Sequence, residues 1–124
     1  MGYTLGPRSR ENLEGVHKDL QRVVERAIEI TDKDFTVIEG LRSKSRQRKL
    51  VNDGKSKTMN SRHLTGHAVD IAPWPISWDW DEFYPIADAM KEAADELGVA
   101  LEWGGDWKSF PDGPHYQLSR KAYP

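Results

Sequence analysis

The sequence predicts one domain that combines helices with short strands. Two long stretches place apolar residues at helical spacing, and four short runs alternate apolar with polar residues or lie between turn-forming residues. At 124 residues, the chain can bury one modest core and is too short for two full domains. We therefore expect a single domain over residues 1–124, with two main helices and four strands.

The first helix is expected over residues 9–31, with Ser9 as its N-cap. Its apolar face consists of Leu13, Val16, Leu20, Val23, Val24, Ala27 and Ile28. The second helix is expected over residues 81–97, where Pro85 is tolerable near the first turn and Gly98 ends the helix. Its apolar face consists of Phe83, Ile86, Ala89, Met90, Ala93 and Leu97. We assign both helices a structural role.

Strands are expected over residues 35–39, 68–72, 99–103 and 115–118. In the second of these, Val69 and Ile71 fall on one face and Asp70 on the other, because strand side chains alternate. The last strand repeats this arrangement, with His115 and Gln117 opposite its apolar residues. Two strands are therefore expected to hold polar residues above a packed core.

The composition limits the classes of function. The chain has no Cys, which excludes disulfides, a thiolate nucleophile and a metal site with Cys ligands. Its formal net charge of −2 gives no overall attraction to nucleic acid or to anionic membranes. The N-terminus lacks the apolar core of a signal peptide, and no apolar run approaches the roughly 20 residues of a membrane-spanning helix. We expect a monomer that stays in the cytoplasm until it is released, without a nucleic-acid partner or stable membrane insertion.

Two segments carry the residues best suited to catalytic chemistry. The first, Ser61–Asp70, reads Ser-Arg-His-Leu-Thr-Gly-His-Ala-Val-Asp, and the second is Asp-Gly-Pro-His at residues 112–115. A catalytic zinc site usually takes three protein ligands from His, Asp, Glu and Cys and leaves a fourth position for water. His63, Asp70 and His115 are suited to these three positions.

Two other histidines are not expected to bind a metal. Strand alternation directs His67 to the same side as Val69 and away from Asp70. His17 lies on the first helix with no second ligand one turn further on.

The motif Ser-x-His-x-x-Gly-x-Ala-x-Asp, the later acid-x-x-His and the segment Trp-Gly-Gly-Asp-Trp at residues 103–107 resemble the zinc D-Ala-D-Ala metallopeptidase family. The most similar subgroup is that of phage endolysins that act as L-alanyl-D-glutamate peptidases. The resemblance extends from about Phe35 to Leu118. It implies an α+β fold of the hedgehog and D-Ala-D-Ala peptidase type, in which a small antiparallel sheet with flanking helices carries zinc in a groove.

The resemblance also implies a role for each residue. The three ligands named above bind Zn2+, and Asp112 is the general base that acts on the zinc-bound water. Much of the wider family uses Glu as the base, whereas Asp is shorter by one methylene, as in the endolysin subgroup. The residues by themselves also allow Asp112 to be a turn residue in Pro-Asp-Gly-Pro. Asp106, followed by Glu102, is the next candidate for the base.

Residues 42–62 are strongly basic, which usually indicates a solvated helix and loop. Arg42 resembles the arginine that this family places at the mouth of the site, and a guanidinium binds a carboxylate or an oxyanion with two parallel hydrogen bonds. Gln47, Ser61 and Trp103 are further candidates for substrate binding. The remaining basic residues are treated as surface.

Residues 73–80 contain three tryptophans and two prolines. The segment is interpreted as a hydrophobic flap over the core or, alternatively, as a wall that faces the substrate.

Three functions are compatible with this pattern. The first is a zinc-dependent endopeptidase that hydrolyses the L-Ala–D-Glu bond of peptidoglycan stem peptides during bacterial lysis, as an endolysin. The second is a carboxypeptidase or dipeptidase acting on D-Ala-D-Ala ends. The third is a non-catalytic binding module that zinc stabilises, which the presence of Asp112 disfavours. The expected partner is therefore a peptidoglycan stem peptide.

Overall fold

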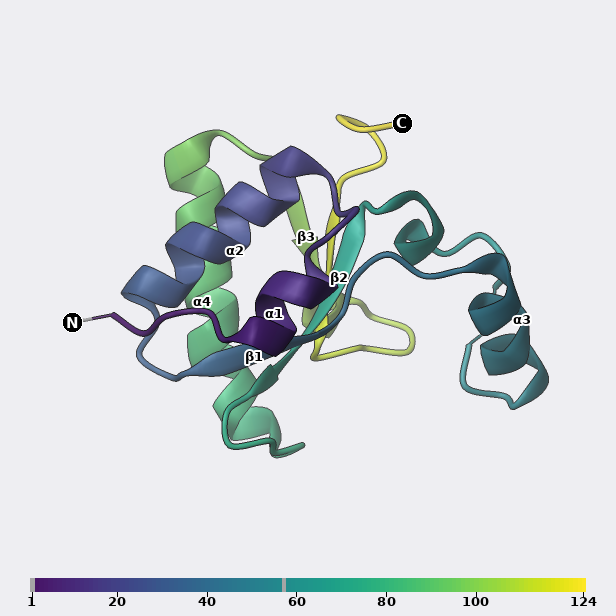
Figure 1. Ribbon diagram of the computed structural model, residues 1–124, viewed down its shortest axis with the longest axis horizontal. Coiled ribbons are helices and arrows are strands. Elements are labelled where there is room, and N and C mark those ends of the chain that lie inside the picture. The colour runs from purple at the N-terminus through teal and green to yellow at the C-terminus, as the bar shows by residue number, and fades with distance from the viewer. Residues whose placement is uncertain (1, 57) are drawn as a thin grey trace.

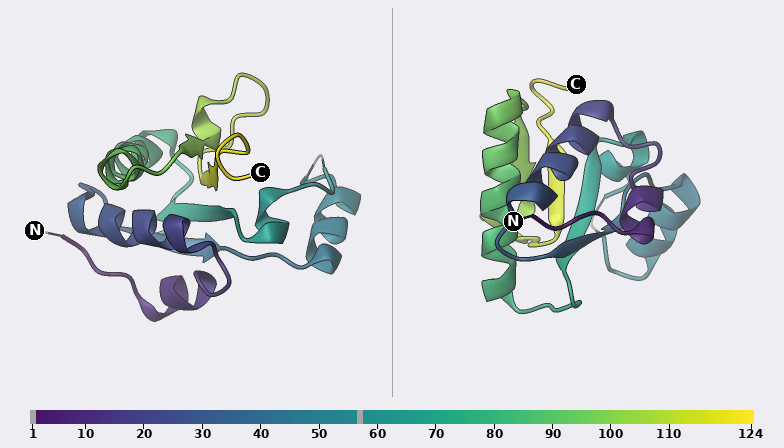
Figure 2. Two further views of the ribbon diagram at one scale, coloured as in Figure 1. Left: turned by 90° about the horizontal axis from the view of Figure 1, so that it is seen from above. Right: turned by 60° about the vertical axis from the view of Figure 1, so that its left-hand side comes forward.

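The computed structural model describes residues 2–56 and 58–124 and has an α+β fold. A four-stranded antiparallel sheet, with strand order β1-β2-β4-β3, forms its centre. The strands are β1 (Phe35–Glu39), β2 (Ala68–Pro73), β3 (Leu101–Trp103) and β4 (His115–Leu118). The long helices α2 (Lys18–Ile30) and α4 (Trp80–Leu97) pack against each other beside the sheet, and α3 (Lys44–Asn52) lies at the opposite end of the molecule (Figures 1 and 2). The four expected strands and the antiparallel sheet are confirmed.

The two faces of the sheet differ in chemistry. Val69 and Ile71 of β2 are completely buried and join the core that the sheet shares with α2 and α4. Asp70, between them, lines a cavity on the other face. The antiparallel register places Asp70 directly opposite His115 of β4. The period-two alternation predicted for these strands is therefore confirmed, and it holds two polar side chains side by side above the core.

The single helix expected over residues 9–31 is wrong. The chain forms a short helix α1 (Pro7–Asn12) and then α2, and Gly15, with φ +81°, lies between them. His17 ends the break: its backbone N–H donates to the carbonyl of Gly66 at 2.8 Å, and its side chain caps α2 by accepting from the Asp19 N–H. The helical spacing of apolar residues continues across the break because both sides contribute to one core. Periodicity alone therefore did not reveal the break.

Ser9 was expected to cap a helix, and this expectation is also wrong. Ser9 lies inside α1 and is buried. Its hydroxyl lies 3.1 Å from the Thr36 hydroxyl and accepts a 2.9 Å hydrogen bond from the Val37 N–H. It fastens α1 to β1.

The second helix, α4, agrees closely with the expectation over residues 81–97. The side chain of Asp79 caps its start by accepting from the Asp81 N–H, and Gly98, with φ +70°, ends it. Pro85 lies inside the helix, just beyond the first turn. None of the helices in the described ranges is long and apolar enough to cross a membrane.

Gly66 and Gly98 allow a matched test of backbone packing, because both have φ near +70° but only one is crowded. A Cβ at Gly98 meets open space, so Gly98→Ala carries only the cost of a left-handed alanine, about 1 kcal/mol. A Cβ at Gly66 lies 2.5 Å from the Gly15 carbonyl oxygen. We expect Gly66→Ala to lower the free energy of unfolding by about 2 kcal/mol more than Gly98→Ala does, measured by urea unfolding. Equal losses would contradict the close approach of these two backbone segments.

Candidate active site

A cavity of about 630 Å³ opens on the polar face of the sheet. Its wall is formed by the end of β1, the end of α3 and the loop after it, the 3-10 turn Arg62–Thr65, strands β2 and β4, and the loop at residues 107–112. The volume lies in the range typical of small-ligand sites. Segments far apart in the sequence therefore converge on one place.

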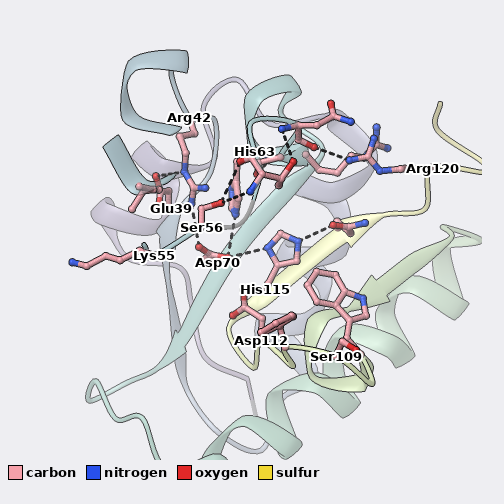
Figure 3. A pocket seen from close by; sticks show the side chains of 18 residues that line it. Glu39, Arg42, Lys55, Ser56, His63, Asp70, Ser109, Asp112, His115 and Arg120 are labelled. Atoms are coloured by element: carbon pink, nitrogen blue, oxygen red, sulfur yellow. Dashed lines mark hydrogen bonds and ion pairs between the residues drawn. The ribbon is translucent and has the colours of Figure 1, made fainter. Parts of the chain in front are cut away.

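His63, Asp70 and His115 form a compact group at the centre of this cavity, and their side chains point toward one another (Figure 3). His63 Nε2 and His115 Nδ1 each lie 3.2 Å from Asp70 Oδ1. One potential ligand atom from each residue lies within 4.8 Å of the other two, as expected for a site that can hold a metal ion. No other such group is found among residues 2–56 and 58–124. The structure thus brings together the three ligands named from the sequence.

The outer nitrogen of each imidazole is fixed by an acceptor. His63 Nδ1 lies 2.9 Å from the Gly40 carbonyl oxygen, which only accepts, so this nitrogen carries a proton. His115 Nε2 lies 2.8 Å from Gln117 Oε1 and is likewise the donor. In a neutral imidazole only one ring nitrogen carries a proton. The nitrogens that face Asp70, His63 Nε2 and His115 Nδ1, would then each carry a free lone pair. A hydrogen bond from the outer nitrogen to a carbonyl oxygen is the usual way in which a histidine ligand is oriented toward a metal ion.

Charge around Asp70 also favours a cation. Burial by itself raises the pKa of this carboxyl, but the hydrogen bonds with His115 and His63 outweigh burial and hold the pKa well below its usual range. Burial lowers the pKa of His115, whereas the hydrogen bond with Asp70 raises it, and the net shift is upward. The surroundings of the partly buried Asp70 carboxyl therefore favour its charged form.

Asp112 lies beside this group, three residues before His115 (Figure 3). Its backbone N–H donates to the Gly104 carbonyl at 2.9 Å, and its own carbonyl accepts from the His115 N–H at 3.2 Å. The surrounding protein and the negative charge of Asp70 raise the pKa of the Asp112 carboxyl. A carboxylate with a raised pKa is a better proton acceptor, as a general base requires.

The other carboxylates considered as bases are placed less well. Asp106 is exposed and pairs with Lys91 at 2.8 Å, and Glu102 accepts from Gln117 at 3.3 Å. Neither is among the residues that line the cavity. Their positions favour Asp112.

Arg42 lines the cavity, but most of its hydrogen-bonding capacity is already used. Nε and Nη2 each donate to the Glu39 carboxylate at 2.8 Å, and Nη1 donates to Gln47 Oε1 at 2.7 Å. Nη2 also lies 3.6 Å from Asp70 Oδ2. Burial raises the pKa of Glu39, but the hydrogen bond from Arg42 outweighs it and lowers the pKa. Arg42 therefore links a second partly buried carboxylate to Asp70.

Gln47 and Trp103 are not placed as substrate-binding residues. Gln47 is fully buried, where it supports Arg42 and donates to the Thr58 carbonyl at 2.6 Å. Trp103 is 5% exposed, and its indole N–H donates to the Gly113 carbonyl at 2.7 Å, which holds the loop of Asp112. Both residues therefore support other parts of the site and do not line the cavity. The sequence did not reveal this because their polar partners are distant in the chain. Ser61 does line the cavity, and its hydroxyl accepts from the His63 N–H at 3.2 Å.

The two excluded histidines also lie outside the metal-binding group. The rings of His17 and His67 contact each other, with centroids 5.4 Å apart, and neither lines the cavity. The tryptophans of residues 73–80 do not line it either. Trp78 and Trp80 instead pack against Phe83, at centroid distances of 6.3 and 6.0 Å, which favours the interpretation as a flap.

Several cavity residues were missed by the sequence analysis: Glu39, Lys55, Trp107, Phe110 and Arg120. Gly104 was missed as well. A Cβ at Gly104 would collide with the Asp112 carbonyl oxygen and lie 3.1 Å from His115 Cβ. The segment Trp-Gly-Gly-Asp-Trp carried the available signal for Gly104 and Trp107, because paired glycines between aromatic residues indicate close backbone approach.

Solved structures support this fold. The crystal structure of Serratia marcescens L-Ala D-Glu endopeptidase ChiX has a TM-score of 0.94 and 50% sequence identity, covering 99% of this chain and 95% of ChiX. The vancomycin-resistance D,D-dipeptidase VanXYg, solved with a D-Ala-D-Ala phosphinate analogue, has a TM-score of 0.54 and 17% identity over 83% of this chain and 50% of its own. The second likeness concerns the fold alone.

Sequence comparison gives the family. L-alanyl-D-glutamate peptidase of Escherichia phage T5 is 33% identical over 130 residues, covering 99% of this chain and 94% of the phage protein. The family model described as phage L-alanyl-D-glutamate peptidase matches residues 1–123. The chain therefore belongs to the phage L-alanyl-D-glutamate peptidase family.

Proposed function

We propose that this chain is a zinc-dependent peptidoglycan endopeptidase that hydrolyses the L-Ala–D-Glu bond of the stem peptide, acting as one catalytic domain. The observation that carries the proposal is the convergence of His63 Nε2, Asp70 Oδ1 and His115 Nδ1 in a cavity that also contains Asp112. Membership of the peptidase family supports the same bond as substrate. We further propose that the protein acts on the cell wall after release from the cytoplasm.

The donor set fits zinc. Two imidazoles and one carboxylate are a known ligand set of catalytic zinc sites, and the fixed outer nitrogens leave the inner ones available. When bound, zinc supplies a water molecule of lowered pKa and polarises the scissile carbonyl.

The protein residues divide the proton and charge transfers between them. The Asp112 carboxylate accepts a proton from the attacking water and then donates it to the amine of the leaving D-glutamyl residue. Arg42, held by Glu39, keeps Asp70 in place and contributes positive charge near the oxygen on which negative charge develops. Trp103 and Gly104 fix the loop that carries Asp112.

The deciding experiment is to identify the new amino termini released from purified peptidoglycan by mass spectrometry. Zinc-loaded protein is expected to free the amine of D-glutamate, and chelated protein is expected to release nothing. Released D-alanine would instead support the carboxypeptidase alternative. Binding of zinc with a higher melting temperature but no released product would support the non-catalytic module.

Asp112→Asn tests the general base. We expect it to lower kcat by about 10²–10⁴-fold, because the amide does not accept the proton, while zinc binding is retained. Asp106→Asn is the matched control: Asp106 is an exposed carboxylate outside the cavity and is expected to be close to wild type. The measurement is the rate of peptide hydrolysis together with zinc content. Loss of zinc from Asp112→Asn would contradict its assignment as a base outside the ligand set.

His63→Gln tests the metal ligands independently of activity. At a zinc concentration 100-fold above the dissociation constant, wild type is expected to gain about 2.7 kcal/mol in unfolding free energy, seen as a higher melting temperature. His63→Gln should lose most of this gain, whereas His67→Gln should keep it, because His67 lies outside the metal-binding group. The reverse order of the two variants would overturn the ligand assignment.

A further inference from the structure

One part of the cavity wall is aromatic. Trp107 and Phe110 belong to the loop that also carries Ser109 and Asp112, and all four residues line the cavity. Trp107 is 36% exposed, and its indole lies 5.2 Å from the ring of His115, between centroids. Phe110 is 72% exposed. Two large rings thus stand at the edge of the candidate metal site, in a part of the site with no role in the chemistry proposed above.

The backbone holds Phe110 in an unusual conformation. Its φ is +52°, and it is the non-glycine residue with positive φ in the described parts of the chain. Such a conformation costs of order 1–3 kcal/mol for a bulky residue and is concentrated at ligand-binding sites. The fold therefore accepts strain at a position where an apolar ring remains largely in contact with solvent, which indicates a ligand contact.

The chemistry of the substrate indicates which group would contact Trp107 and Phe110, and this step rests on the proposed function. In peptidoglycan, the amino group of the L-alanine is joined by an amide bond to the lactyl group of N-acetylmuramic acid. One residue spans at most about 3.6 Å, so the sugar begins one residue away from the bond that is cut. An enzyme that cuts the L-Ala–D-Glu bond of intact peptidoglycan must accommodate this sugar at the edge of its active site.

From these observations we infer that Trp107 and Phe110 form a subsite for the N-acetylmuramyl sugar on the amino side of the scissile bond. The C–H face of a pyranose ring is apolar and packs on aromatic rings, which supply large contact areas at low cost in side-chain entropy. The part of the stem peptide beyond the cut carries carboxylates, and these suit cationic residues such as Lys55, which lies across the metal-binding group from Ser109 (Figure 3). The two sides of the cavity therefore match the two ends of the substrate.

The test compares two substrates that differ only in the sugar: N-acetylmuramyl-L-Ala-γ-D-Glu-L-Lys and D-lactyl-L-Ala-γ-D-Glu-L-Lys. The lactyl group keeps the amide and removes the sugar, so the ratio of the two kcat/KM values isolates the sugar subsite. We expect zinc-loaded wild type to favour the muramyl substrate about tenfold, the size of one good aromatic contact. Phe110→Ala should reduce the ratio to about threefold or less, and Phe110→Tyr, which keeps a ring, should restore it.

Trp78→Ala is the matched control, because Trp78 is 61% exposed but does not line the cavity. It should keep the wild-type ratio. Equal cleavage of the two substrates by wild type, or loss of the preference in Trp78→Ala but not in Phe110→Ala, would overturn the subsite. Failure to cleave either substrate would overturn the proposed function and the subsite with it, whereas cleavage without a preference would overturn only the subsite.

Discussion

The whole site depends on the side chains of His63, Asp70 and His115, which are held around one point. Pairing of β2 with β4 sets Asp70 opposite His115, and the 3-10 turn before β2 adds His63. The Gly40 carbonyl and Gln117 occupy the outer nitrogens of the imidazoles, so the inner nitrogens face a carboxylate. A cation placed among these three side chains would offset the negative charge of Asp70. The sheet therefore brings together the groups that could hold a cation.

Packing on the opposite face keeps this arrangement rigid. Each ligand strand alternates a buried apolar residue with a polar one, so the core formed with α2 and α4 fixes the height and direction of Asp70 and His115. Supporting contacts come from partly buried polar groups, above all the ion pair of Arg42 with Glu39. Close backbone contacts at Gly66 and Gly104 leave little room for the turn of His63 or the loop of Asp112 to move. The positions of the site residues are thus fixed by the packing of the fold around them.

The sequence predicted those features that depend on local pattern. Strand alternation was enough to separate Asp70 from its apolar neighbours. The residue types of His63, Asp70 and His115, together with the family resemblance, were enough to predict that these three side chains lie together. The sequence pattern did not predict that the helix is interrupted near Gly15. Helical periodicity shows which residues are buried, and α1 and α2 are buried in the same core. The sequence analysis assigned Gln47 and Trp103 to substrate binding. In the structure their polar groups bind distant parts of the chain instead, and only the tertiary structure reveals these partners. In the same motif, Trp107 lies four residues after Trp103 and does line the cavity.

The most direct test of the account is a crystal structure of the zinc-loaded protein with anomalous scattering measured on both sides of the zinc absorption edge. The account predicts one zinc peak in the cavity, bound by His63 Nε2, His115 Nδ1 and a carboxylate oxygen of Asp70 at about 2.0–2.2 Å, with Asp112 nearby but not bound. A zinc peak elsewhere, such as beside His17 and His67, would contradict it. So would a peak in the cavity with Asp112 as a ligand, because the proposed base would then be occupied by the metal.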